Sequence, residues 1–128
     1  MISLIGKKLK PEIKKRWQKA LGEYPQAQGK LRTPDGFCCL GVLGDLAVQD
    51  GLAHWNEYLE LVVNDDYKEG MEFPECLLSW AFEDINLNTE DLASSTSFTY
   101  SKVGTSLAYD NDNGANFAQI SQLIEDHF

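Results

Sequence analysis

Two cationic residues lie beside aromatic residues early in the chain. Lys30 and Arg32 alternate in the run Gly29-Lys30-Leu31-Arg32, and Tyr24 and Phe37 stand on either side of it. Cationic side chains bind phosphate groups, and aromatic rings stack on nucleobases. The pattern therefore indicates a binding site for a phosphate-bearing ring compound. The simpler alternative is the solvated edge of a strand.

The cysteines are the second group that could carry chemistry. Cys38 and Cys39 are adjacent and Cys76 stands alone, which is the spacing of neither a zinc site nor a secreted disulfide framework. A nucleophilic cysteine would need a histidine base, and only His54 and His127 are present. The sequence favours reduced thiols buried in a core helix.

The run Asp110-Asn111-Asp112-Asn113-Gly114 resembles half of a calcium-binding loop. With Gly114 at the sixth position of such a loop, Ile120 falls where a bidentate glutamate is required, so the register fails. A tight turn that caps the last helix through Asn113 or Asp112 is the expected structure, and a ligand-facing polar turn is the alternative. We expect no metal and no cofactor.

Enzyme signatures are missing from the sequence. The pairs of neighbouring carboxylates lie in polar stretches and are too common to be specific, and no phosphate loop, nucleophile elbow or kinase motif occurs. We therefore expect a protein that is not an enzyme. A small hydrolase is the less favoured alternative.

A few elements must position these residues. Leu9, Ile13, Trp17 and Leu21 recur every four residues, and Pro11 suits a first helical turn. The pattern predicts a helix over residues 11–21. The nearly all-apolar run 37–49 predicts a central helix, in which Gly41 and Gly44 would let another backbone approach closely. The residues between these helices, 33–36, have the composition of a tight turn with Gly36 at positive φ.

The other predicted elements are shorter. They are a strand near 30–33, a hairpin of 53–55 with 58–63, a turn at 64–66, a helix over 74–82, a loop over 86–101 with a strand near 98–100, a helical turn at 105–109 and a last helix over 115–126. Together they predict an α+β fold: a single helix-dominated domain over residues 1–128 with a small antiparallel sheet. No apolar run approaches the length of about 20 residues that a membrane span needs, and no export signal is recognised.

Charge is divided unevenly along the chain. Residues 1–35 carry nine Lys or Arg and three Asp or Glu, and residues 36–128 carry two and seventeen. The net charges of +6 and −15 give the total of −9. Because residues 36–128 are so acidic, they repel nucleic acid, and we do not expect nucleic acid as a partner. Internal attraction between the two parts is the simplest interpretation.

Several segments together resemble a family of small proteins encoded by phages and prophages. The most specific is Phe37-Cys38-Cys39-Leu40-Gly41-Val42-Leu43 with Asp45-Leu46. The other matching residues, spread over most of the chain, are Arg16-Trp17, Ala20-Leu21, Gly29, Leu31, Arg32, Pro74, Trp80-Ala81, Leu107-Ala108, Asn111-Asp112, Gly114, Phe117, Ile120 and Leu123-Ile124-Glu125.

The resemblance implies a phage accessory protein that acts in the host cytoplasm against host immunity. One strategy of such proteins is to sequester, without cleavage, the nucleotide-derived signal that activates a defence effector. The expected ligand-binding residues are Lys30 and Arg32 for phosphates, Tyr24, Phe37 and Trp80 for stacking, Asn111 and Asp112 for sugar hydroxyls, and Asp45 from the most specific segment. Such proteins often form homo-oligomers with the site between chains. The alternative is an acidic inhibitor that binds a host defence protein.

Overall fold

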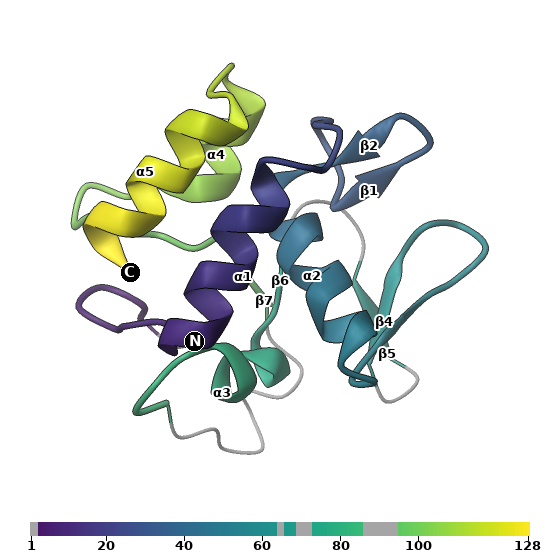
Figure 1. The fold of residues 1–128 in the computed structure, drawn as a ribbon, viewed down its shortest axis with the longest axis horizontal. Coiled ribbons are helices and arrows are strands. Elements are labelled where there is room, and N and C mark those ends of the chain that lie inside the picture. The colour runs from purple at the N-terminus through teal and green to yellow at the C-terminus, as the bar shows by residue number, and fades with distance from the viewer. Residues whose placement is uncertain (1–2, 64–65, 69–72, 86–94) are drawn as a thin grey trace.

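Helix α1 (Pro11–Leu21) runs through the middle of the fold, between α2 (Cys39–Gln49) and α5 (Phe117–His127) (Figure 1). The computed structural model describes residues 3–63, 66–68, 73–85 and 95–128. Within them, α1 contacts both α2 and α5, and α4 (Leu107–Asp112) contacts α2 and α5. The predicted helix-dominated α+β fold is confirmed.

Trp17 joins α1 to α2. Its side chain is completely buried, and its Nε1 donates a hydrogen bond to the backbone oxygen of Cys39 at 3.0 Å. Ile13 and Leu21, from the same predicted stripe, are also buried. Burial of one such apolar side chain contributes about 1.5–3 kcal/mol, so this stripe fixes the position of α1 on the core.

Gly41 lets α2 approach the chain before it. A Cβ atom at Gly41 would lie 1.7 Å from the backbone oxygen of Leu31, so no other residue fits there. The predicted close backbone approach is confirmed at this position. Gly44 instead faces side chains, with Leu61 Cδ2 at 2.9 Å from the equivalent Cβ position.

In the part of the chain that the structure describes, the strands form three small antiparallel sheets rather than the one sheet predicted. The predicted hairpin of residues 53–55 with 58–63 is present with shorter strands. Residues 36–37, expected in a turn and at the start of a helix, instead pair as a strand with residues 32–33. In the described residues the pairs are β1 (Arg32–Thr33) with β2 (Gly36–Phe37), β4 (Leu61–Val63) with both β3 (His54–Trp55) and β5 (Asp66–Lys68), and β6 (Phe73–Pro74) with β7 (Ser95–Thr96).

The middle of the chain departs from the prediction in detail. Pro74 ends β6, and the predicted helix begins after it as the 3₁₀ turn η1 (Glu75–Leu77) and continues as α3 (Leu78–Ala81). Residues 64 and 65 of the predicted turn and residues 86–94 of the predicted loop lie outside the described residues.

Phe98 occupies the centre of the aromatic core. The strand predicted near it is wrong, because Phe98 has a left-handed backbone with φ of 62° and β7 ends before it. Its buried ring lies 5.5–5.8 Å from the rings of Trp17, Phe73, Phe82 and Phe128. These contacts offset the cost of the left-handed backbone conformation at Phe98, which is on the order of 1–3 kcal/mol.

The last two helices meet at a tight turn. The helical turn predicted near residue 107 extends to Asp112 as α4, and Gly114 reverses the chain with φ of 103°. The cap predicted from Asn113 or Asp112 is wrong: Asn116 directly precedes α5 and forms a capping box with Gln119. No helix in the described part of the chain is both long and apolar enough to cross a membrane.

Candidate functional site

The hairpin β1–β2 places Arg32 against aromatic rings. Arg32 and Phe37 are cross-strand partners, so their side chains share one face of the hairpin. The Arg32 guanidinium carbon lies 5.0 Å from the centre of the Phe37 ring and 5.5 Å from that of Trp55. Such cation–π contacts contribute about 0.5–1 kcal/mol each at an exposed site and fix the plane of the guanidinium.

The segment before the hairpin brings Tyr24 to the same place. Phe37 N donates to Pro25 O at 2.9 Å, and Ala27 N donates to Phe37 O at 2.8 Å. The Tyr24 ring consequently meets the Phe37 ring edge to face at 5.1 Å. Gly36 allows this approach, since a Cβ there would lie 2.4 Å from Pro25 O. The prediction of a positive φ at Gly36 is wrong; the close backbone contact is what requires glycine.

Asp45 connects α2 to these rings. Its Oδ1 accepts a hydrogen bond from Trp55 Nε1 at 2.9 Å, and its Oδ2 accepts one from the Tyr24 hydroxyl. Gln49, one turn further along α2, donates from Nε2 to the Tyr24 hydroxyl at 3.1 Å. Burial, and then the hydrogen bond to Asp45, raises the pKa of Tyr24 to about 12. The hydroxyl therefore stays protonated at neutral pH and remains a donor.

We call Tyr24, Arg32, Phe37, Asp45 and Trp55 the cation–aromatic cluster. All five side chains are partly exposed. Among the described residues, none accepts a hydrogen bond from the Arg32 guanidinium or forms an ion pair with it. A guanidinium held by two ring faces, with its N–H donors uncommitted in this part of the chain, is preorganised for an anion.

A hollow of about 300 Å³ opens beside Tyr24. Two cations, Arg16 and Lys19 of α1, line it together with Tyr24, Gln49 and the acidic Glu23. Asp50 fixes Arg16 through two hydrogen bonds of 2.9 and 3.1 Å, which lower the pKa of the Asp50 carboxyl. Tyr24 thus belongs both to this α1 hollow and to the cation–aromatic cluster, and joins the two.

The other predicted ligand residues are exposed or are engaged in other contacts. Lys30 is exposed, and Trp80 donates from Nε1 to Asp50 Oδ2 at 3.0 Å. Asn111 is completely buried: its Oδ1 accepts from Cys39 N at 3.2 Å, and its Nδ2 donates to the backbone oxygen of Ala27. Asp112 accepts from the backbone N–H of Gly29 at 2.8 Å. Asn111 and Asp112 therefore hold the segment 27–29 that leads into the hairpin.

The adjacent cysteines are part of the core. Burial raises the pKa of Cys38 to about 11 and that of Cys39 well above its usual range, so both thiols are protonated at neutral pH. Cys38 Sγ accepts from Gly41 N at 3.4 Å at the start of α2, and Cys39 Sγ donates to Leu107 O at 3.6 Å. These contacts are structural.

Sequence reasoning missed four members of the site: Arg16, Lys19, Gln49 and Trp55. The two cations carry no sequence signal that separates them from the other basic residues of α1. Gln49 is one helical turn from Asp45, and this i, i+4 spacing was a usable signal. No sequence signal points to Trp55, because only the return of β3 alongside α2 brings it to the hairpin.

Comparisons with known proteins place the chain in one family. Residues 9–128 match a family described as "Domain of unknown function (DUF8296)". No curated protein and no solved structure matches the chain. Because the matched region covers nearly the whole chain, including the cation–aromatic cluster and the α1 hollow, the protein belongs to the DUF8296 family.

Proposed function

We propose that the protein binds a nucleotide-derived signal and sequesters it without cleaving it. The observation that carries this proposal is the Arg32 guanidinium, which is fixed over two aromatic rings and has no acidic partner among the described residues. On a chain with a net charge of −9, an unpaired and immobilised cation marks a place suited to an anion.

The arrangement around Arg32 suits the parts of a nucleotide. A base can stack on the guanidinium plane or on the exposed part of the Trp55 ring. The Tyr24 hydroxyl and the Asp45 carboxylate are oriented polar groups that suit sugar hydroxyls. Lys19 in the adjacent hollow can supply positive charge for a phosphate, whereas Arg16 is already paired with Asp50.

The biological setting of the proposal comes from the resemblance to phage proteins. A phage accessory protein in the host cytoplasm would lower the free concentration of an immune signal by binding it stoichiometrically. Such a role needs affinity and no catalytic base. The protonated Cys38 and Cys39 supply no nucleophile for cleavage. A homo-oligomer with the cluster between chains is part of the same proposal.

The direct test is binding of cyclic dinucleotides and of cyclic ADP-ribose, measured by thermal shift and calorimetry. Mass spectrometry after heat denaturation should recover the ligand intact. Arg32→Ala should weaken binding by at least tenfold. Lys30→Ala is the matched control, because it removes a neighbouring cation that is exposed, and it should leave the affinity within about twofold.

The results separate the alternatives. Absence of binding to every probe would refute the sequestration proposal, and recovery of a cleaved ligand would indicate a hydrolase. The acidic body, with a net charge of −15 over residues 36–128, keeps a protein inhibitor as the second candidate. A salt-sensitive, stoichiometric host partner in a pull-down, together with no nucleotide binding, would favour that function.

A further inference from the structure

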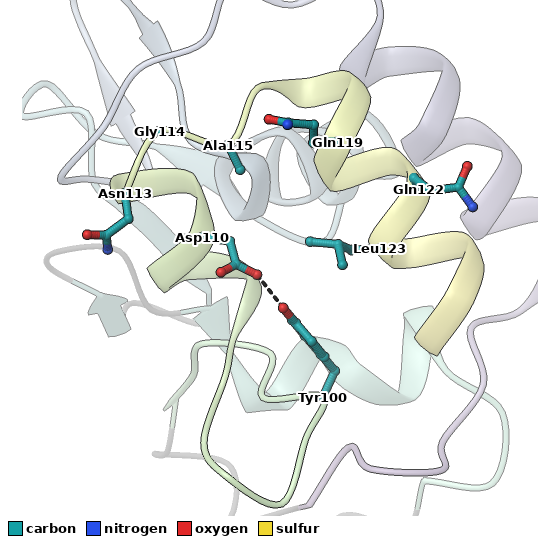
Figure 2. A pocket seen from close by; sticks show the side chains of 8 residues that line it. All are labelled: Tyr100, Asp110, Asn113, Gly114, Ala115, Gln119, Gln122 and Leu123. Carbon is teal, nitrogen blue, oxygen red and sulfur yellow. Dashed lines mark hydrogen bonds between the residues drawn. The ribbon is translucent and has the colours of Figure 1, made fainter.

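A second concave site lies between α4 and α5, separate from the cation–aromatic cluster. Figure 2 shows this α4–α5 groove, with Tyr100 and Asp110 on one side and Leu123 of α5 facing them. Its volume of about 600 Å³ is in the range of small-molecule sites. The residues that line it are Tyr100, Asp110, Asn113, Gly114, Ala115, Gln119, Gln122 and Leu123.

The charge of the groove is negative. Among the described residues, Asp110 is the only charged one in its lining. Its Oδ2 accepts a hydrogen bond from the Tyr100 hydroxyl, while its Oδ1 has no hydrogen bond to any described residue. Burial and the contact with Asp110 raise the pKa of Tyr100 to about 12, so the phenol stays neutral beside the carboxylate. A phosphate would meet this carboxylate, and the described residues of the lining supply no compensating cation.

Apolar surface lies next to this carboxylate. Leu123 is only partly buried and lines the groove with Ala115. The Tyr100 ring is held by stacking on His127 at 4.4 Å. A rigid aromatic ring, an aliphatic wall and a half-buried carboxylate together suit a cation on an alkyl stem, since the stem is desolvated while the charge is paired.

The amide side chains of the lining are engaged in helix contacts, which disfavours a sugar. Asn113 donates to Tyr109 O at 2.8 Å, Gln119 Oε1 accepts from the Asn116 backbone in the capping box, and Gln122 donates to Asp126. A sugar would need several of these groups to converge on its hydroxyls. The Asp110 carboxylate is left as the main polar anchor.

We propose that the α4–α5 groove binds an alkyl-linked guanidinium or ammonium group, with Asp110 pairing the charge and Leu123 and Tyr100 covering the alkyl stem. This chemistry occurs both in free small amines and in arginine or lysine side chains of a partner protein. The proposal is independent of nucleotide binding, because the groove and the cation–aromatic cluster share no residue.

The test is a titration of the ¹⁵N-labelled protein with agmatine and, separately, with the blocked tripeptide acetyl-Gly-Arg-Gly-amide. We expect saturable shifts of the backbone amides around residues 110–115 and 119–123 with at least one of the two probes. Agmatine alone would indicate a free amine as the ligand, and the peptide alone would indicate a protein side chain. Failure of both probes to bind, or weak shifts spread over the acidic surface without saturation, would overturn the proposal.

Two variants localise the effect. Asp110→Asn removes the charge and should weaken binding by at least tenfold, whereas Asp35→Asn makes the same change in the exposed β1–β2 turn and should leave affinity within about twofold. If Asp110→Asn proves unstable, Tyr100→Phe serves in its place. This variant frees Asp110 from its hydrogen bond and should retain binding. Equal affinity for Asp110→Asn and the wild type, with both folded, would refute the role of the groove.

Discussion

Replacement of Asn111 by alanine should destabilise the whole fold. Asn111 Oδ1 accepts the N–H of Cys39, the first residue of α2, and Asn111 Nδ2 donates to Ala27 O at 2.9 Å. Asn111→Ala leaves both backbone groups without these partners, at about 1–3 kcal/mol each. Gln26 Nε2 also loses Asn111 Oδ1 but keeps Ala115 O at 2.8 Å, so it adds little. The expected loss is about 2–6 kcal/mol.

Equilibrium unfolding in urea measures this loss as a lower midpoint. Asn113→Ala is the matched control, since Asn113 is exposed and, among the described residues, its side chain donates only to Tyr109 O in the helix that it ends; it should cost about 1 kcal/mol or less. A loss below about 1 kcal/mol for Asn111→Ala would contradict the reasoning. Equal losses of stability for the two variants would also contradict it, because the burial and long-range hydrogen bonds of Asn111 would then contribute nothing to stability.

Two further predictions concern packing and pH. Gly41→Ala should prevent folding, because its Cβ would lie 1.7 Å from the backbone of Leu31. Gly44→Ala should stay folded, because the nearest atom to its Cβ is the end of the flexible Leu61 side chain. Circular dichroism and soluble yield distinguish these outcomes. The hydrogen bonds from Arg16 lower the pKa of Asp50, so the pair stabilises the fold at neutral pH. Because both side chains are partly exposed, this contribution should be less than about 1 kcal/mol. It should disappear as pH falls through the folded pKa of Asp50. Unfolding curves of Asp50→Asn and wild type should thus differ at about pH 6 and converge near pH 2; a constant difference would refute the ion-pair explanation.

Local features of the sequence predicted the long elements. The four-residue spacing of Ile13, Trp17 and Leu21 after Pro11 specified α1 to its last residue, because a helix depends on contacts within a few positions. The apolar run after Phe37 likewise specified α2. The short strands were placed less well, since a two-residue strand gains its stability from its neighbours and leaves a weak periodic signal.

The candidate site shows the same division. Sequence reasoning selected Tyr24, Arg32, Phe37 and Asp45, and the structure brings these four together. It did not predict Trp55, which reaches them only because β3 folds back beside α2. Polar residue types alone cannot show whether a side chain faces solvent or a buried backbone group.

By itself, the sequence determined the basic α1, the central α2, the tight turn at residues 33–36 and the grouping of a cation with aromatic rings. These features depend on residue type, periodicity and neighbours along the chain. The tertiary structure decided that Asn111 is a buried link between α4 and the start of α2, that Lys30 is exposed, and that Asp110 faces a groove. Those roles depend on which groups from distant segments meet, because burial and partner, more than residue type, determine what a polar side chain does.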